Sequence, residues 1–276
     1  MLRIGTIELD CPAVMGILNV TPDSFSDGGR FAATDAAVRR AEAMLGAGAA
    51  IIDVGGESTR PGAGSVSEQQ ELDRIIPVIE VICGALDVPV SVDTSKPGVM
   101  RAAVAAGAAI INDVRAFQEE GALQAAVDLQ QPVCLMHMRG QPRTMQQDPD
   151  YADVVAEVTQ FLSVRVAQCR AAGLGEDLII VDPGFGFGKT TAHNVRLLAD
   201  LRPLLDLGVP VLIGVSRKST LGKITGRDVG GRLAASIAAA VLAATQGVHI
   251  IRAHDVAETV DALKIVRKVM ESIDSQ

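Results

Sequence analysis

The feature that most constrains this chain is a regular alternation of short apolar runs with longer helical segments. Each of the eight runs is rich in Ile, Val, Leu and Ala, and the segment after it repeats apolar residues at a spacing of three to four. The apolar runs are 13–18, 50–54, 88–92, 109–111, 133–136, 178–181, 210–213 and 249–251. The helical segments are 35–46, 68–85, 97–106, 122–129, 151–172, 193–205, 232–244 and 256–270. Because these strands are continuously apolar, we expect both of their faces to be buried, as in a parallel sheet covered by helices.

Eight strand–helix units in a chain of 276 residues predict an α/β fold of the (β/α)8 TIM barrel type. An open, doubly wound parallel sheet shows the same alternation and is the alternative. Residues 2–10 precede the first strand, and we expect them to form a short N-terminal β-hairpin at the bottom of the barrel. Since no Pro-, Gly- or Ser-rich linker divides the chain, we expect a single domain over residues 1–276.

Composition excludes several classes of protein. The hydrophobic fraction of 48% rules out a disordered chain. A net charge of −8, with six Phe, one Tyr and no Trp, argues against nucleic acid or an anionic membrane as a partner. The longest apolar stretch, 234–244, is too short to span a bilayer. The four cysteines lie far apart with no CxxC pair, and the first residues do not read as a secretory signal. We therefore expect free thiols and a cytoplasmic location.

A polar side chain follows every predicted strand. In a barrel the carboxyl ends of the strands meet at one face, where active sites lie. Any one of these residues could simply cap the next helix, but so many converging on one face favour a ligand site. They are Asn19, Asp53, Asp93, Asn112, His137, Asp182, the trio Ser216, Arg217 and Lys218, and Arg252 with His254.

Two of the loops that follow strands are too long to be simple connectors. They are 19–34 and 54–67, and each contains a pair of adjacent glycines. They also carry Phe25, Arg30 and, in the second loop, Thr59 and Arg60. Loops of this length tend to be lids or binding loops, and we expect that role here.

The glycine-rich stretch 182–191 looks like a phosphate-binding loop but fits neither common pattern. A P-loop needs glycine where Pro183 stands, and the glycines at 184, 186 and 188 do not match the dinucleotide fingerprint. Within this stretch we expect Lys189 to be a solvated residue at the start of a helix.

The strand-end residues point to two ligand chemistries. Arg252 and His254 follow the last strand, where barrels often hold phosphate, so we expect an anionic group there. Asp93, Asn112 and Asp182 suit a heterocycle with adjacent N–H donors, and a lysine such as Lys218 can reach a ring carbonyl or nitrogen. Together they predict a polar heterocycle that carries a phosphate, and they leave the reaction open.

Two long motifs and six short ones carry a family resemblance. MGILNVTPDSFSDGG at 15–29 and DVGGESTRPG at 53–62 closely resemble the two signatures of the dihydropteroate synthase family of pterin-binding enzymes. The shorter motifs follow in the family order over essentially the whole chain, at 91–96, 111–114, 136–138, 182–189, 214–219 and 252–256. Ala253 and the segment 226–232 depart from the usual pattern.

The resemblance implies a transferase of folate biosynthesis. It would condense 6-hydroxymethyl-7,8-dihydropterin diphosphate with 4-aminobenzoate to give 7,8-dihydropteroate and diphosphate. Sulfonamides would be inhibitors, Mg²⁺ the cofactor, and a homodimer the assembly.

The resemblance also implies roles for individual residues. Asp27, Arg60 and Lys218 would be catalytic. Pterin and diphosphate would be bound by Thr59, Asp93, Asn112, Asp182, Lys218, Arg252 and His254. The 4-aminobenzoate pocket would comprise Phe25, Thr59, Pro61, Phe187 and Ser219, and Asn19 would ligate the metal.

The scarce aromatic residues lend this reading some support. Five of the seven follow predicted strands, and we expect them at the mouth of the barrel, where two ring-shaped substrates would bind. They are Phe25, Phe31, Phe117, Phe185 and Phe187.

Three other functions remain open. A pterin-binding methyltransferase that acts with a corrinoid protein would share the pterin pocket but would not need a diphosphate site. A Schiff-base aldolase would use Lys218 as its nucleophile. A barrel that binds pterin without turnover would be the non-enzymatic alternative.

Overall fold

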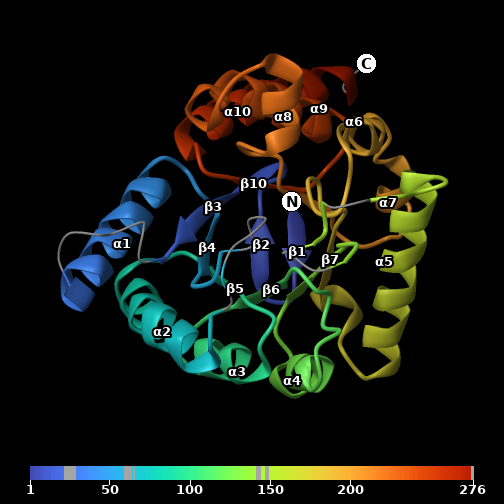
Figure 1. The fold of residues 1–276 in the computed structure, drawn as a ribbon. Helices are drawn as coiled ribbons and strands as arrows, with labels where there is room; N and C mark the ends of the chain where they lie inside the picture. The colour runs from blue at the N-terminus through green and yellow to red at the C-terminus, as the bar shows by residue number, and fades with distance from the viewer. Residues whose placement is uncertain (22–28, 59–63, 65, 141–143, 147–148, 275–276) are drawn as a thin grey trace.

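The computed structural model of the chain describes residues 1–21, 29–58, 64, 66–140, 144–146 and 149–274, with side chains for these except 29–33 and 274. Figure 1 shows a central ring of strands surrounded by helices. Eight strands form one parallel sheet in the order β8-β7-β6-β5-β4-β3-β10-β9. A parallel bridge between Val181 and Val211 joins the two ends of this order, so the sheet closes on itself. The predicted (β/α)8 barrel is confirmed, and the open-sheet alternative is wrong.

The barrel strands lie close to the predicted apolar runs. Most are shifted by one or two residues toward their polar ends, because the strand ladder continues into the residues that carry the polar side chains. The strands are β3 (Ala13–Asn19), β4 (Ile51–Gly55), β5 (Val90–Asp93), β6 (Ile110–Asp113), β7 (Val133–Met136), β8 (Ile179–Asp182), β9 (Leu212–Ile213) and β10 (Ile250–Ala253).

The helices differ from the prediction in three places. α1 begins at Gly29 rather than residue 35, so the first long loop is shorter than expected. The predicted helix 193–205 is two helices, because the chain leaves the helical conformation at Asp200 and Pro203 begins a new turn. A short helix after β9, α8, was not predicted. The helices are α1 (Gly29–Gly46), α2 (Glu68–Ala85), α3 (Pro97–Ala105), α4 (Ala122–Leu129), α5 (Val154–Ala171), α6 (Thr191–Ala199), α7 (Arg202–Leu205), α8 (Ser219–Thr225), α9 (Leu233–Thr245) and α10 (Val256–Asp274), with 3-10 turns η2 (Glu176–Leu178) and η3 (Val229–Gly231).

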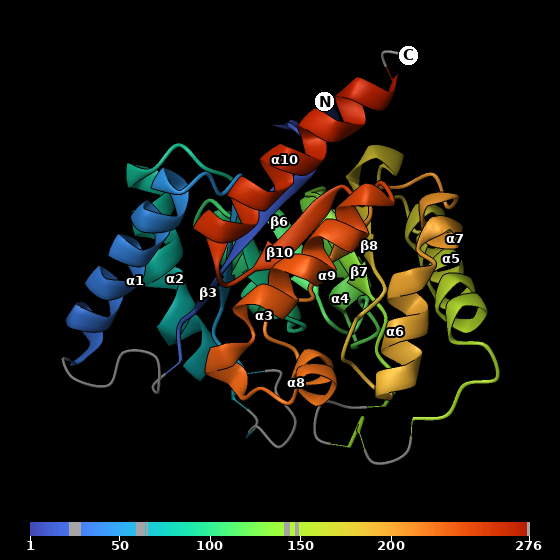
Figure 2. The same ribbon diagram turned by 90° about the horizontal axis from the view of Figure 1, so that it is seen from above.

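The predicted N-terminal hairpin is present and plugs one end of the barrel. β1 (Leu2–Ile4) pairs antiparallel with β2 (Ile7–Leu9). Their inward residues Ile4, Ile7 and Leu9 are buried in the barrel interior. Arg267 of α10 donates to the Asp10 carbonyl oxygen just after the hairpin at 2.9 Å, and Figure 2 shows α10 running beside β3.

Each barrel strand separates two cores, because successive side chains point to opposite faces. One set of residues packs outward against the helices, as Ile52 and Ile111 do. The other set fills the barrel interior above the hairpin and includes Met15, Ile51, Ile110, Cys134, Ile180, Leu212 and Ile250. Two residues farther along a strand, the same inward face reaches the carboxyl end of the barrel, and that is where the polar residues lie.

Candidate active site

Strand alternation places the polar side chains in one inward layer. Asp53 follows Ile51 by two residues, Asn112 follows Ile110, and Asp182 follows Ile180. Arg252 is likewise two residues after Ile250. Because every one of these apolar partners faces the barrel interior, the polar residues face inward as well, one layer nearer the carboxyl ends.

Arg252 is the centre of this layer. Its Nε lies 2.6 Å from Asp53 Oδ2, and its Nη2 lies 2.8 Å from Asp93 Oδ2. Asn112 Nδ2 donates to Asp53 Oδ2 at 3.3 Å. Burial opposes the charge of Arg252, but Asp53 and Asp93 outweigh it and raise the pKa of the guanidinium. Four strands are thus linked through one permanently charged side chain.

Two carboxyls of the inward layer, Asp93 and Asp182, differ from ordinary aspartates. Burial raises the pKa of Asp93 to about 7, because Arg252 only partly offsets the loss of water and the Asp53 carboxylate is close. Burial also raises the pKa of Asp182, although its Oδ1 accepts a 2.7 Å hydrogen bond from Gly184 N. A ligand that offers N–H donors to these oxygens would stabilise their ionised forms.

Lys218 reaches the same layer from the segment after β9. The preceding Arg217 has a positive φ of 57°, and Lys218 is the N-cap of α8. Its Nζ lies 4.0 Å from the centre of the Phe187 ring. Burial and the nearby Arg252 lower the pKa of Lys218 to about 8, although Asp182 acts in the opposite direction.

His254 and Arg217 contribute less positive charge to the site than the sequence suggested. Burial and Arg252 lower the pKa of His254 to about 3, so its ring is neutral near pH 7. Its Nδ1 lies 3.0 Å from Ser216 Oγ, which also accepts from the His254 backbone N at 3.2 Å. Arg217 points away from the site and pairs with Asp255. The cations of the layer are therefore Arg252 and Lys218, among the described residues.

Of the remaining expected site residues, some are placed by the structure and others are not. Asn19 ends β3 opposite Gly55 and is half-buried. Ser219 is exposed at the first position of α8. Within the described ranges, no group of three or more His, Cys, Asp or Glu is arranged to hold a metal. Five expected residues lie outside the described residues, namely Phe25, Asp27, Thr59, Arg60 and Pro61.

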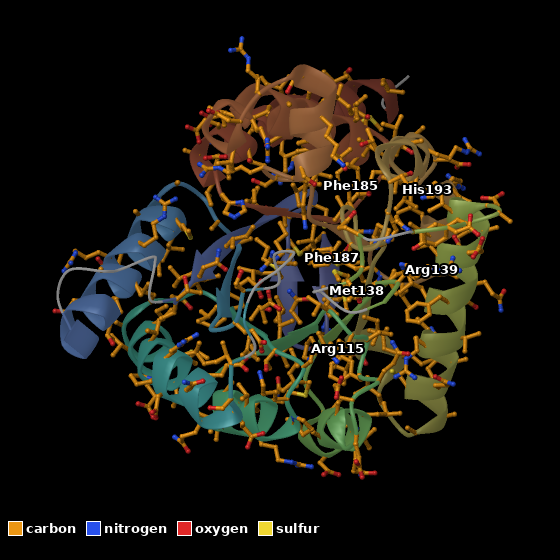
Figure 3. All side chains as sticks on the ribbon, viewed as in Figure 1. Arg115, Met138, Arg139, Phe185, Phe187 and His193 are labelled. Atoms are coloured by element: carbon orange, nitrogen blue, oxygen red, sulfur yellow. The ribbon has the colours of Figure 1, made fainter. Side chains whose placement is uncertain are left out.

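The aromatic residues are divided between two environments. Phe187 packs with Met136, Met145 and Val114 in a small cluster of its own, near the barrel axis in Figure 3. Phe117 and Phe185 belong instead to the core between sheet and helices. The expectation that these two rings line the mouth is wrong, because the turns that carry them direct the rings outward.

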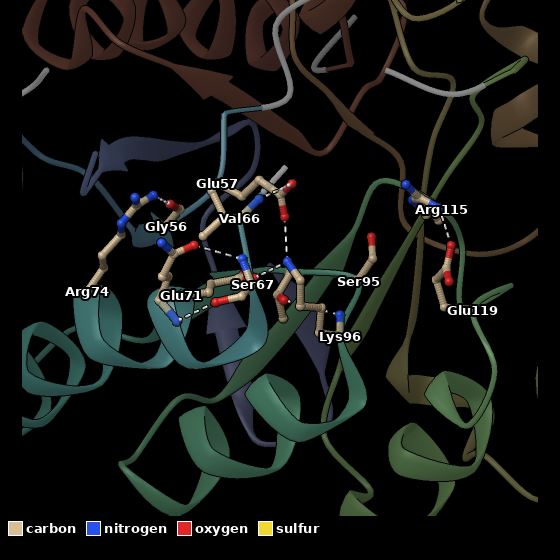
Figure 4. A network of polar contacts seen from close by, with 12 residues as sticks. Gly56, Glu57, Val66, Ser67, Glu71, Arg74, Ser95, Lys96, Arg115 and Glu119 are labelled. Carbon is tan, nitrogen blue, oxygen red and sulfur yellow. Dashed lines mark hydrogen bonds and ion pairs between the residues drawn. The ribbon is translucent and has the colours of Figure 1, made fainter. Parts of the chain in front are cut away.

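A second polar network fixes the two ends of the loop between β4 and α2 (Figure 4). Lys96 Nζ lies 2.5 Å from Glu57 Oε2, at the start of the loop, and 2.5 Å from Glu71 Oε2, in α2. Glu57 Oε1 accepts from Val66 N at 3.4 Å, near the end of the loop. Ser67 then begins α2 with a capping box.

Sequence reasoning missed two residues of this region. Asp53 was seen as a strand-end residue but was not assigned to the site, although it bonds both Arg252 and Asn112. Its position two residues after Ile51 was the available signal. Lys189 was expected in solvent, yet only 2% of it is exposed. No sequence signal marked that burial, because the surrounding groups come from β7 and from its own loop.

Comparisons with known proteins identify the family of the chain. The family model described as "Pterin binding enzyme" matches residues 15–254. The dihydropteroate synthase of Escherichia coli K12 is 51% identical over 271 residues, covering 98% of this chain and 96% of the relative.

Two solved structures are similar over nearly the whole chain. Yersinia pestis dihydropteroate synthase in a sulfonamide drug complex superposes with a TM-score of 0.93 at 51% identity, covering 98% of this chain and 99% of that one. Xanthomonas albilineans dihydropteroate synthase with 4-aminobenzoic acid has a TM-score of 0.90 at 53% identity, covering 95% and 94%. This chain therefore belongs to the pterin-binding enzyme family and, within it, to the dihydropteroate synthases.

Proposed function

We propose that the inward polar layer at the carboxyl ends of the barrel strands is where this chain carries out the dihydropteroate synthase reaction. That reaction joins 6-hydroxymethyl-7,8-dihydropterin diphosphate to 4-aminobenzoate and releases diphosphate. The observation that carries the proposal is the convergence of Asp53, Asp93, Asn112, Lys218 and Arg252 on one buried layer. Those groups supply both the acceptors for a pterin and the positive charge for an anion.

The pterin would be held by groups on strands β5, β6 and β8 and at the start of α8. Asp93 and Asp182 accept hydrogen bonds from the ring N–H groups, and Asn112 both donates and accepts. Lys218 reaches the ring carbonyl or a ring nitrogen. Burial raises the pKa values of both aspartates, so their ionised forms are unfavourable in the ligand-free protein. Hydrogen bonds from the pterin N–H groups would stabilise those ionised forms.

The diphosphate would lie toward Arg252, His254 and Thr59. Arg252 supplies a fixed charge, and the neutral His254 supplies an N–H donor. A Mg²⁺ cofactor fits the Asn19 side chain, whose amide oxygen is a hard ligand. Magnesium commonly takes one or two protein oxygens with the rest from phosphate and water, so no larger cluster is needed. When bound, the ion neutralises charge on the leaving diphosphate.

The second substrate would enter beside Phe187 and Ser219, with Phe25, Thr59 and Pro61 completing the pocket. In the reaction the C–O bond to diphosphate breaks, a C–N bond to the amine forms, and the nitrogen loses one proton. An aniline nitrogen is neutral at pH 7, so no strong base is required. Lys218, Arg60 and Asp27 would be the catalytic residues, Asp27 by stabilising the cationic methylene or accepting the proton.

The assembly is part of the same proposal. α10 exposes Ile265, Val269 and Ile273 at a spacing of four, with 52–67% of each residue accessible. The neighbouring α9 exposes Leu242 in the same way. Exposed apolar stripes on adjacent helices are typical of a subunit interface, so we propose a homodimer formed by α9 and α10.

Cellular location and inhibitors complete the proposal. All four cysteines are free thiols in the structure, as expected of a cytoplasmic protein. Among the helices that the structure describes, none is long and apolar enough to cross a membrane. Sulfonamides that mimic 4-aminobenzoate would compete for the Phe187 side of the site.

A diphosphate-release assay tests the proposed reaction. We expect release that requires both substrates and Mg²⁺ and that a sulfonamide inhibits. Arg252→Met should lower kcat/KM by about 100-fold or more, because a buried charge facing the diphosphate is lost. Arg202→Met, which removes a cation that is 79% exposed on α7, should leave kcat/KM unchanged.

Two results would contradict the proposal. Diphosphate release that does not depend on 4-aminobenzoate would indicate a hydrolase. Borohydride trapping of a carbonyl substrate on Lys218 would indicate the aldolase.

A further inference from the structure

Lys189 is a fully buried lysine whose ammonium group binds only neutral partners. Its Nζ lies 2.9 Å from His137 Nδ1, 2.9 Å from Gly184 O and 3.1 Å from Phe187 O. These contacts account for all three donors of an ammonium group. Burial and the Lys189 charge lower the pKa of His137 to about 2, so the imidazole is neutral and its Nδ1 accepts. Burial lowers the pKa of Lys189 itself to about 7, so a lysine in this position is costly to keep charged, and its three hydrogen bonds to the surrounding groups call for a specific role.

The loop that Lys189 contacts has one backbone hydrogen bond of its own, from Phe187 N to Gly184 O at 3.0 Å, and otherwise relies on side chains. It turns through glycines with positive φ at 184, 186 and 188. A Cβ at Gly184 would lie 1.8 Å from His137 O, and one at Gly188 would lie 2.4 Å from Arg139 O. The loop therefore packs backbone against backbone, and its glycines have little intrinsic preference for this conformation.

Side chains outside the turn supply donors to its carbonyls. Lys189 Nζ donates to Gly184 O and Phe187 O, and Tyr151 Oη donates to Gly188 O at 2.9 Å. Gln146 Nε2 donates to Gly186 O at 2.8 Å. Of these donors, Lys189 alone holds two carbonyls, at positions 184 and 187, and so bridges the turn.

Phe187 is the one residue of this turn whose side chain faces the site. Its carbonyl oxygen accepts a hydrogen bond from Lys189 Nζ on the side of the turn away from the site. Its ring packs on Met136 and lies 4.0 Å from Lys218 Nζ. Asp93, Asn112 and Asp182, which are expected to hold the pterin, lie on strands, where ladder hydrogen bonds fix the backbone. Phe187 lies outside the sheet, so its backbone is held by the bond from its N to Gly184 O and by the bond from Lys189 Nζ to its own carbonyl oxygen.

We propose that Lys189 is a positioning residue for 4-aminobenzoate, because it fixes the 184–188 turn and thereby the Phe187 ring. This inference rests on the proposed function, in which Phe187 borders the 4-aminobenzoate site. Lys189 does not touch either substrate. We expect its effect to fall chiefly on the KM for 4-aminobenzoate, whereas a general structural role would change both KM values.

Steady-state kinetics of Lys189→Met test the role. Methionine keeps the apolar stem and removes all three donors. We expect the KM for 4-aminobenzoate to rise by about tenfold, corresponding to the loss of one or two hydrogen bonds from a charged donor. The KM for the pterin diphosphate and kcat should stay within about twofold. Lys268→Met, at a position 79% exposed, is the matched control and should change neither KM.

A double-mutant cycle separates an effect through Phe187 from any other. In a Phe187→Ala background, Lys189→Met should no longer raise the KM for 4-aminobenzoate, because no ring is left to position. Tyr151→Phe provides a milder variant in which one donor to the same turn is lost. It should raise the same KM by about two- to threefold and leave the pterin KM unchanged.

The outcomes are distinguishable. If the wild-type protein releases diphosphate without regard to 4-aminobenzoate, the proposed function is wrong. If the wild-type protein depends on 4-aminobenzoate but Lys189→Met and Tyr151→Phe change both KM values equally, or neither, the role of Lys189 is wrong. Additive effects in the Phe187 cycle would also overturn it.

Discussion

At the residue scale, the protonation states of individual buried groups determine which hydrogen bonds and charges the site can offer to its substrate. Asp93 and Lys218 lie 125 residues apart in sequence, but both are close to Arg252 in the structure. Burial moves both pKa values toward neutrality, that of Asp93 upward to about 7 and that of Lys218 downward to about 8. The ligand-free site therefore has its two titrating groups close to physiological pH.

These values predict a bell-shaped pH profile of kcat/KM for the pterin diphosphate. Activity should rise with pH through about 7, as Asp93 loses its proton and becomes an acceptor for the pterin N–H groups. It should fall as pH increases through about 8, as Lys218 loses its charge. Rates measured between pH 5.5 and 9.5 check both limbs.

Two variants assign the limbs. Asp93→Asn cannot titrate and should lose the acid limb at a lower maximum rate. Lys218→Met should lose the alkaline limb. A wild-type profile that is flat between pH 6 and 9 would rule out this assignment.

At the element scale, one cation joins a loop to two helices. Lys96 precedes α3 and contacts Glu57 at the start of the loop and Glu71 in α2. Only 1% of the Glu71 side chain is exposed, and its Oε1 has no hydrogen-bond partner within the described part of the chain. A carboxylate this buried depends on its one cation, so the network is a critical contact between α2 and α3.

We expect Lys96→Met to lower the free energy of unfolding by about 2–3 kcal/mol, because it leaves Glu71 buried without a counter-charge. Urea denaturation measures this loss. Lys264→Met breaks an exposed pair with Asp261 and should cost less than about 0.5 kcal/mol. Adding Glu71→Gln to Lys96→Met should restore part of the loss. Equal effects of the two lysine substitutions would contradict the importance of the network.

At the scale of the whole molecule, the barrel has two unlike surfaces. The strand ends meet at a polar mouth, while α9 and α10 turn apolar side chains toward solvent on the flank of the ring (Figure 1). A helix already packed on the sheet gains nothing from exposed Ile265 and Val269 unless another surface covers them. This flank is where we propose that a second copy of the chain packs.

Sedimentation velocity tests this dimer. The wild-type chain should sediment at twice the mass of 28.7 kDa at micromolar concentration. Val269→Glu places a charge in the apolar stripe and should shift the protein to a monomer, weakening association by about 100-fold or more. Val164→Glu, on the exposed face of α5, should remain dimeric. A monomeric wild-type protein would overturn the assembly.

Several features of the site followed from the sequence, and others did not. Asp93, Asn112, Asp182 and Arg252 were assigned because strand ends in a barrel share one face, and the structure brings them together. Asp53 was not assigned, because its role depends on which neighbour Arg252 reaches across the barrel. The prediction that Lys189 is solvated is wrong for a similar reason. Lys189 is buried against His137, which follows β7 and is 52 residues away in sequence.

The sequence by itself determined the barrel, the order of its elements and the family, because these depend on local periodicity and on contiguous motifs. Tertiary structure alone decided which groups ionise near neutral pH, which aromatic ring faces the site and which lysine is buried. Those properties depend on distances between residues far apart in the chain and on the water that folding removes from around them. Arg252, whose partners are Asp53 and Asp93 from other strands, illustrates the difference.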